Sequence, residues 1–334
     1  MQKIEISAKT IIFTVLFILL LQFLVVIKDL IFALFIAFIV ASALRPFVIW
    51  LTERKIPRTV SLIIVYLLFV GALGSTVALI IPPLINELFL LAKTLPSIVR
   101  KLVPNNLGFI NINSIVQYVP NLTNQFITVV QGAFSNIVFL MSILFFSFYF
   151  LIEENTIKKI LIKFFDENQS QKVNDIFGGA EKKLNSWFWG ELVLMTVVGV
   201  LTFIGLSLIG LKYVIPLALL AGLLEVVPNL GPTIAAIPAV LIGFSQSYFL
   251  GIAALAVSFI VQQLENNVIV PVVMKKAVGV SPAITLIALI IGGKLTGVMG
   301  VLLAIPTMLF LEVVIMEMIR KPNIKKIQTT KDSI

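Results

Sequence analysis

The sequence contains no cysteine and no histidine, and these two absences remove much of the usual catalytic chemistry. Without Cys the chain has no disulfide, no thiolate nucleophile and no thiolate metal ligand. Without His it has no Ser-His catalysis, no HExxH zinc site and no histidine proton relay. Only four Asp occur, none in the middle of an apolar run, which argues against a membrane aspartyl protease. No GxxxxGKS or GxxxxGKT loop supplies an ATP motor. We therefore expect no enzyme activity, no cofactor and no metal.

Charged residues are also scarce, because they make up 12% of the 334 residues while hydrophobic residues make up 59%. An average soluble domain is about 25% charged and roughly 45–50% apolar, so the composition predicts an integral membrane protein. Its apolar runs have helical length, unlike the short alternating strands of an outer-membrane barrel. The net charge of +9 comes from basic residues at the ends of apolar segments, where the positive-inside rule places them. We therefore expect a lipid bilayer as the partner and no nucleic acid.

Five apolar segments have nearly the length that a membrane-spanning helix needs, about 20 residues. The first follows two lysines, but no small-residue cleavage site comes after it, so we interpret it as a retained helix and not as a signal peptide. The second continues towards Trp50, and Arg45-Pro46 marks its exit from the membrane. The five predicted spans are residues 11–27, 30–44, 60–81, 133–152 and 192–209. Three of them fall in an N-terminal region, residues 1–82.

Two polar regions separate the spans. Residues 83–132 hold short amphipathic pieces rich in Pro and Asn. Residues 153–189 contain one apolar helical face, which we expect to pack against the bundle or a neighbouring subunit. The tryptophans and phenylalanine at residues 187–189 form an interfacial aromatic belt. The apolar face consists of Val173, Phe177, Ala180, Leu184, Trp187 and Phe188.

Basic residues predict the orientation in the membrane. Loop 45–58, region 153–189 and the tail 321–334 are rich in Lys and Arg, whereas region 83–132 holds only three basic residues. By the positive-inside rule, the basic regions and both termini face the cytoplasm. Region 83–132 then faces outside.

The C-terminal region, residues 190–320, contains two long apolar stretches that are broken near the middle. The first, residues 215–244, is interrupted by Pro-Asn-Leu-Gly-Pro at residues 228–232. A proline inside a helix removes a hydrogen bond and clashes with the preceding turn. The stretch is too long for one span and too short for two. We therefore expect a re-entrant hairpin of two half-helices.

The second broken stretch, residues 281–318, predicts another hairpin. Its interruptions lie at Gly292-Gly293-Lys294 and around Gly297 and Gly300. With two hairpins and residues 251–263 crossing the membrane, Lys275 and Lys276 fall in the cytoplasm, as their charge prefers. If every stretch is a full span, these two lysines fall outside, and this alternative stays open.

The two broken stretches resemble each other. Pro216 begins one and Pro282 the other, and Ala236-Ile237-Pro238 recurs as Ala304-Ile305-Pro306. Paired discontinuous segments point to the binding site of a transporter. The predicted fold is an all-α integral membrane protein with five N-terminal spans and a transport region with two broken or re-entrant hairpins, about eight membrane segments in total.

Two carboxylates, Glu225 and Glu265, lie inside this apolar region. Ionisable groups at membrane depth are costly and usually functional. We interpret them as part of a substrate and ion site, where amides and unwound carbonyls coordinate the cargo and a carboxylate carries a proton or Na⁺. The alternative is that both cap half-helices and hydrogen-bond the backbone at the breaks. The candidate binding residues are Glu225, Asn229, Gly231, Gln262, Gln263, Glu265, Asn266, Asn267, Gly292, Gly293 and Lys294.

Three motifs closely resemble the AI-2E family of bacterial transporters. They are PNLGPTI at residues 228–234, QLENNVIVPVVM at residues 263–274, and GGKLTGVMGVLLAIP at residues 292–306. Shorter matches are Arg45-Pro46 together with residues 54–59, and residues 81–84. The resemblance extends over essentially the whole chain.

The resemblance implies a permease of the bacterial or archaeal cytoplasmic membrane that runs without ATP. Family members are associated with export of the signal autoinducer-2, and others with Na⁺/H⁺ exchange. The family is also linked to homo-oligomers, as pentamers, with a mobile transport domain that bears hairpins. Residues 228–232 and 263–267 match the family pattern without an obvious departure.

Our main hypothesis is a secondary-active transporter that exports a small polar solute, or a signalling molecule like autoinducer-2, by alternating access or an elevator motion. The first alternative is a Na⁺(Li⁺)/H⁺ antiporter that uses the same carboxylates. The second is a membrane scaffold that transports nothing and presents residues 83–132 and 153–186 to partners.

Overall fold

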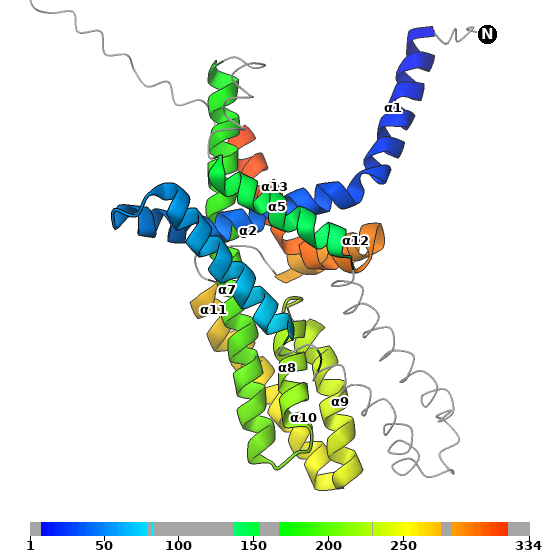
Figure 1. Ribbon diagram of the computed structural model, residues 1–334. Helices are drawn as coiled ribbons and strands as arrows, with labels where there is room; N and C mark the ends of the chain where they lie inside the picture. Colours follow the sequence, from blue (N-terminus) through cyan, green and yellow to red (C-terminus); the bar gives the residue numbers. More distant parts are fainter. Residues whose placement is uncertain are drawn as a thin grey trace, which may run out of the picture. The chain divides into compact units, whose positions relative to one another are not determined.

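The structure is a computed structural model, and it describes residues 8–78, 82, 136–153, 167–228, 230–274 and 282–319. Among these residues it contains helices and turns and no β-strand, which confirms the predicted all-α class. The helices (Figure 1) are α1 (Ala8–Val26), α2 (Lys28–Glu53), an unlabelled helix (Arg58–Ala78), α5 (Ile137–Ile152), α7 (Glu167–Leu208), α8 (Val214–Leu224), α9 (Leu230–Gln246), α10 (Tyr248–Leu264), the π-helix η1 (Glu265–Ile269), α11 (Val270–Val273), α12 (Pro282–Thr296) and α13 (Val298–Ile319).

The chain divides into two compact units, and each is described by itself. Unit 1 consists of Met1–Glu154 and Phe188–Lys275, and unit 2 consists of Asn155–Trp187 and Lys276–Ile334. Helix α7 therefore contributes its N-terminal part to unit 2 and its C-terminal part to unit 1.

Six helices in the described part of the chain are long and apolar enough to cross a membrane, which confirms a multi-span membrane protein. They are Lys9–Val26, Lys28–Glu53, Arg58–Ala78, Gln169–Leu208, Tyr248–Val273 and Val298–Ile319. Shorter apolar helices are α5, α8, α9 and α12. Helix α2 does not end at the predicted membrane exit but continues through Pro46 to Glu53.

In unit 1, α2, the helix Arg58–Ala78 and α5 share a core of buried apolar side chains that includes Leu151. At its edge, Arg45 donates a hydrogen bond to the carbonyl of Phe150, and Arg58 donates one to the carbonyl of Leu151. Both carbonyls lie at the C-terminal end of α5, where the helix dipole favours a cation. Arg45 therefore helps to close the end of this helix.

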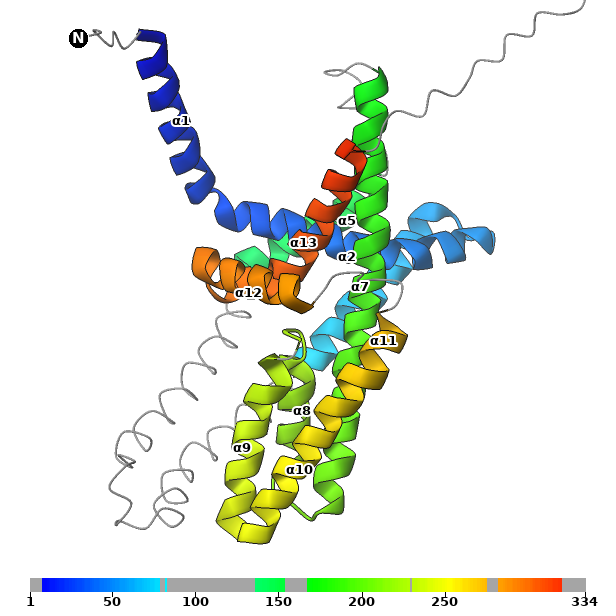
Figure 2. The same ribbon diagram turned by 180° about the vertical axis from the view of Figure 1, so that it is seen from behind.

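The C-terminal part of α7 packs with α8, α9 and α10 in the same unit, and Figures 1 and 2 show α8, α9 and α10 side by side. Fully buried side chains of this bundle include Val198, Leu206, Leu217 and Ala254. Small residues let helices approach closely in a membrane, and here Gly199 of α7 faces Gly222 of α8. A Cβ atom on Gly222 would lie only 2.7 Å from the carbonyl oxygen of Met195.

The chain turns back between α8 and α9, which confirms the predicted break within residues 215–244. Helix α8 ends at Leu224 and α9 begins at Leu230. The return is tight at Gly231, because a side chain there would collide with the carbonyl of Leu224. At about 1.5 Å per residue, α8 is far shorter than the hydrocarbon core of a bilayer, about 30 Å.

In unit 2, the N-terminal part of α7 packs along α13. Phe177 meets Phe310 edge to face with ring centroids 6.2 Å apart. The Lys183 Nζ atom lies 2.6 Å from Glu312 Oε1, and Leu184 is fully buried. The apolar face predicted on this part of α7 is therefore a packing surface within unit 2.

The second broken stretch is interrupted at one place and not at two. The predicted interruption at Gly292-Gly293-Lys294 is wrong, because these residues are helical inside α12. Glycine suits the helix here because Gly292 packs against the backbone of Gly300, where a side chain has no room. The break lies at Gly297, whose φ of +66° is a left-handed conformation that favours glycine.

Candidate functional site

Glu225 and Glu265 come from different helices and meet inside unit 1. Glu225 is the C-cap residue of α8. Glu265 is the first residue of η1, the π-helical turn that continues α10, and such turns often occur at functional sites. Both side chains are 0% exposed, and their carboxyl groups lie close enough for each to influence the charge of the other. The structure thus brings together the two carboxylates that the sequence singles out.

The pair has no hydrogen-bond donor within the described part of the chain. All four of its carboxyl oxygens are buried there without a partner of that kind. The charged groups that act on Glu225 are themselves acidic, namely Glu265 and Glu191. The alternative interpretation is that both carboxylates cap half-helices and hydrogen-bond the backbone at the breaks. Both residues occupy C-cap positions, of α8 and α10, but neither side chain accepts a hydrogen bond from a described backbone group.

Two ionised carboxylates at this place would be strongly unfavourable. A buried charge without a partner is costly, and like charges at short range repel each other. Glu225 also lies at the C-terminal end of α8, the negative end of the helix dipole. The pair therefore needs at least one proton or a bound cation as a counter-charge. Such an exchangeable positive charge is the chemistry that this arrangement can provide.

Glu191 is a third buried carboxylate, which the sequence analysis did not single out. It lies on α7 and acts electrostatically on Glu225. Two residues earlier, the indole Nε1 of Trp189 donates a hydrogen bond to the carbonyl of Ala43 at 3.1 Å. A signal was present in the sequence, because Glu191 directly precedes the apolar stretch 192–209. Its tryptophan neighbours made it look like part of an aromatic belt at the membrane surface.

The amide side chains of the same motif flank Glu265 in sequence, and none of them is a hydrogen-bond partner of the carboxylate pair. Gln262 Nε2 donates to Thr233 Oγ1 at 3.1 Å, which links α10 to α9. Asn267 Nδ2 donates to the Gln263 carbonyl at 2.9 Å, and Gln263, Asn266 and Asn267 are all exposed. At membrane depth, exposed polar groups need a polar partner or a water-filled cavity. These amides are therefore suited to line a path for a polar solute.

The other predicted site residues are spread over the chain. Gly231 lies at the start of α9, in the tight return from α8, and Asn229 falls outside the described residues. Gly292 and Gly293 are partly buried and Lys294 is exposed, and all three belong to unit 2. Within the part of the chain that the structure describes, no group of three acidic side chains is arranged to hold a metal ion.

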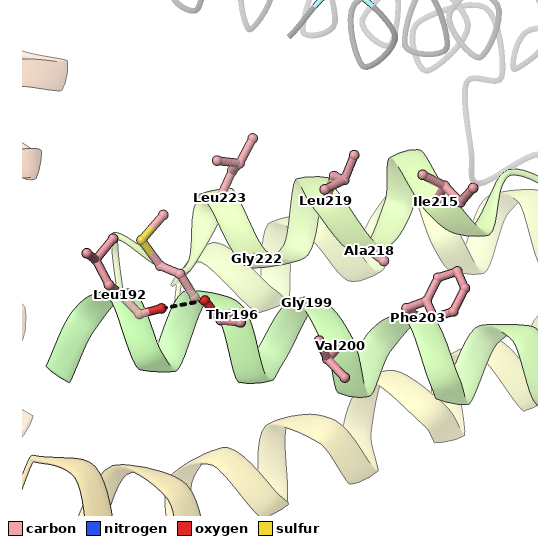
Figure 3. Close-up of a pocket in the computed structure, with 11 residues that line it drawn as sticks. Leu192, Thr196, Gly199, Val200, Phe203, Ile215, Ala218, Leu219, Gly222 and Leu223 are labelled. Carbon is pink, nitrogen blue, oxygen red and sulfur yellow. Dashed lines mark hydrogen bonds between the residues drawn. The ribbon is translucent and has the colours of Figure 1, made fainter. Parts of the chain in front are cut away.

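A cavity of about 440 Å³ lies between α7 and α8 (Figure 3). Leu192 and Leu223 lie at one end of this cavity. Leu192 directly follows Glu191 in sequence, and Leu223 lies two residues before Glu225. Its lining is apolar apart from Thr196, whose hydroxyl donates to the Leu192 carbonyl at 2.8 Å. This lining suits an apolar group, so we place the ion chemistry at the carboxylates and not in the cavity.

Comparisons with known proteins point to one family. A protein-family model described as AI-2E family transporter matches residues 11–320. Three relatives bear the name "Putative transport protein". YueF of Bacillus subtilis (strain 168) is 30% identical over 307 residues, which cover 85% of this chain and 83% of the relative. YrrI of the same strain is 26% identical over 324 residues, 89% of each chain. YhhT of Escherichia coli (strain K12) is 25% identical over 290 residues, 83% of this chain and 82% of the relative. These names indicate transporters and not enzymes.

Proposed function

Because this chain belongs to the AI-2E family of transporters, we propose that it is a secondary-active transporter of a small polar solute and that the Glu225–Glu265 pair carries the coupling ion. The solute class is a small polar molecule such as an autoinducer-2-like signal, and the direction is export. One observation carries the proposal: two adjacent carboxylates from different helices are 0% exposed and have no hydrogen-bond donor among the described residues.

The helix break beside the pair supports a mechanism of alternating access. Glu225 ends α8 and therefore belongs to the α8–α9 hairpin, whereas Glu265 belongs to the segment α10–η1. A small movement of the hairpin against α10 separates the two carboxyl groups and opens the pair to one side of the membrane. The proton or cation held between them is then exchanged on that side, and the exposed amides Gln263 and Asn267 are available to the solute.

The same proposal includes the topology. We propose that α8–α9 and α12–α13 are re-entrant hairpins, which gives about eight membrane segments. The basic loops and both termini are then cytoplasmic. Homo-oligomerisation, as implied by the family resemblance, stays a prediction.

A second candidate function is the exchange of Na⁺ or Li⁺ for protons. The carboxylate pair favours it directly, because ion exchange requires only a site that accepts either a proton or a monovalent cation. The two candidates differ in one observable, since the exchanger moves ions in the absence of any organic solute.

The test uses inside-out vesicles that contain the purified protein, with autoinducer-2 outside and a pH or Na⁺ gradient across the membrane. We expect a gradient to drive uptake, and Glu225→Gln and Glu265→Gln to abolish gradient-driven uptake, because Gln keeps the size of Glu but cannot exchange a proton. The exposed carboxylate of Glu53 provides the control, and Glu53→Gln should transport like the wild type.

Three other outcomes are informative. Ion flux without solute uptake selects the second candidate function. Unchanged uptake by both pair variants shows that the site is wrong. No flux of either kind contradicts transport and favours the scaffold hypothesis.

A further inference from the structure

The cavity between α7 and α8 is a narrow apolar groove where two glycines meet (Figure 3). A Cβ atom on Gly199 would lie 3.6 Å from the Gly222 Cα atom, so the two helices nearly touch at this point. Neither glycine has a side chain to fill the space above the contact. The larger side chains on both helices therefore stand as walls around an open slot.

Each wall of the groove is one face of a helix, because residues three or four apart in sequence lie on the same side of a helix. Leu192 lies near Leu223 at one end of the groove, and Phe203 lies near Ile215 at the other (Figure 3). The groove is thus elongated and runs along both helices. Its wall residues are Leu192, Thr196, Val200 and Phe203 of α7, and Ile215, Leu219 and Leu223 of α8.

The groove opens towards lipid and offers no free polar side chain. Val200 is 50% exposed, and Ile215 is 63% exposed. This part of α7 belongs to the candidate membrane span Gln169–Leu208, so the open side meets the hydrocarbon of the bilayer. The one polar side chain of the lining, Thr196, already donates its hydroxyl to the Leu192 carbonyl at 2.8 Å. An occupant therefore needs apolar surface and no hydrogen-bonding group.

The length and position of the groove match one leaflet of the membrane. From Leu192 to Phe203, α7 rises roughly 16 Å at about 1.5 Å per residue, and one leaflet supplies half of a hydrocarbon core of about 30 Å. Trp189 is exposed and lies three residues before Leu192, and tryptophan collects at the boundary between lipid tails and water. A hydrocarbon chain that begins at the headgroup level therefore fits the groove from end to end.

We propose that this groove binds one acyl chain of a membrane phospholipid, from the leaflet that lies at the Leu192 end. In the proposed topology this is the cytoplasmic leaflet. The site takes the opposite chemistry to the carboxylate pair, since a small polar solute finds no free hydrogen-bonding side chain in the groove. Leu223 lies two residues before Glu225, so a bound chain also packs against the end of α8 that leads into the hairpin turn.

The test uses the full chain in phospholipid vesicles with a trace of a phospholipid that carries a photoactivatable diazirine in one acyl chain. Mass spectrometry locates the label after illumination. We expect residues 192–203 and 215–223 to carry about ten times more label per residue than residues 11–26, a preference of about 1.4 kcal/mol. Residues 11–26 of α1 are the reference for bulk lipid, because their large apolar side chains are 41–80% exposed.

The position of the diazirine along the chain tests the orientation. A diazirine near the headgroup should label the Leu192 end of the groove, and a diazirine near the terminal methyl group should label the Phe203 end. The reverse order overturns the assignment to this leaflet.

Two substitutions should block the groove. Thr196→Phe fills it from its open side and Leu219→Trp fills it from α8, and each should reduce the label in the groove to the level of α1. The matched control is Leu16→Trp on α1, where the side chain is 60% exposed, and it should leave the label in the groove unchanged. Thermal unfolding in detergent identifies a variant that does not fold, and the other variant then supplies the result.

Several outcomes overturn the inference. Equal labelling of the groove and α1 shows bulk lipid only, and wild-type labelling in a folded groove variant shows that the chain binds elsewhere. Because the chain has no cysteine, Val200→Cys provides a single thiol, and disulfide-linked dimers would show that a second copy covers the groove. Displacement of the label by autoinducer-2 would assign the groove to the transported solute. The carboxylate pair is tested by none of these results, so the inference can fail while the proposed function stands.

Discussion

Replacement of Gly222 by alanine should push α8 away from α7. A Cβ atom at this position would lie 2.7 Å from the Met195 carbonyl oxygen and 3.3 Å from the Gly199 Cα atom. Ordinary contact begins at 3.4 Å, so the helices must separate by about 0.7 Å, an overpacking of the kind that closely packed interiors resist. Both neighbours are backbone atoms, and no side-chain rotation can relieve the contact.

The magnitude follows from two opposing terms. Overpacking of this kind lowers the free energy of unfolding by about 1–3 kcal/mol. Replacement of Gly by Ala inside a helix raises it by up to about 1 kcal/mol. Gly71→Ala, in the helix Arg58–Ala78, measures the helix-propensity effect alone, because nothing lies within 4 Å of a Cβ atom at Gly71. Gly222→Ala should therefore be less stable than Gly71→Ala by about 1–3 kcal/mol, since the propensity term cancels.

The assay is unfolding by heat or denaturant in detergent, followed by gradient-driven uptake in vesicles. Because Gly222 lies three residues before Glu225, the C-cap residue of α8, a displaced helix also shifts Glu225 relative to Glu265, and uptake should fall. The reasoning is refuted if Gly222→Ala and Gly71→Ala unfold with the same free energy, since the tight contact between α7 and α8 would then not exist.

Three other substitutions have effects that the contacts predict. Gly231→Ala should lower the unfolding temperature in detergent, because a side chain there meets the backbone at the end of α8; unchanged thermal unfolding would contradict the tight return. Lys183→Ala should lower the free energy of unfolding by no more than about 1 kcal/mol, since its pair with Glu312 is partly exposed, and the difference from wild type should shrink in high salt. Arg45→Ala should lower the free energy of unfolding by about 1.5–3 kcal/mol, the contribution of a hydrogen bond from a charged group, because the Phe150 carbonyl loses its donor. Denaturant unfolding that matches the wild type would contradict this.

Helix positions were largely predictable from apolar length. Proline favours the break before Pro228 because it costs a helix one hydrogen bond, but it does not determine a break by itself, since α2, α9 and α13 continue through Pro46, Pro238 and Pro306. Glycine gives a weaker signal, as Gly292 and Gly293 demonstrate. A helical glycine costs only about 1 kcal/mol relative to alanine, which close packing against Gly300 can outweigh. Only Gly297, with its positive φ, interrupts the helix.

The candidate site was predictable in its members but not in its arrangement. Glu225 and Glu265 stand out in sequence because a carboxylate in an apolar run is rare and costly. Their proximity depends on how α8 packs with α10 and η1, which no local pattern encodes. Glu191 required the same tertiary information, because only the packing of α7 against α8 brings it within electrostatic range of Glu225. A carboxylate beside tryptophans otherwise looks like an ordinary residue of the membrane surface.

The two broken helix pairs share a backbone plan and differ in charge. Pro238 lies eight residues after Leu230, the first residue of α9, and Pro306 lies eight residues after Val298, the first residue of α13. In both helices, therefore, the carbonyl group four residues before the proline loses its hydrogen bond at the same position. The first helices of the pairs end differently, since α8 is followed by the buried Glu225 and α12 carries the exposed Lys294 in its last turn. The repeated scaffold therefore explains the shape of both helix pairs. The ion chemistry depends on an acidic residue at the end of the first helix, which α8–α9 has and α12–α13 lacks. For this reason α12–α13 cannot compensate for the loss of Glu225, and a single Glu→Gln change should be enough to uncouple transport.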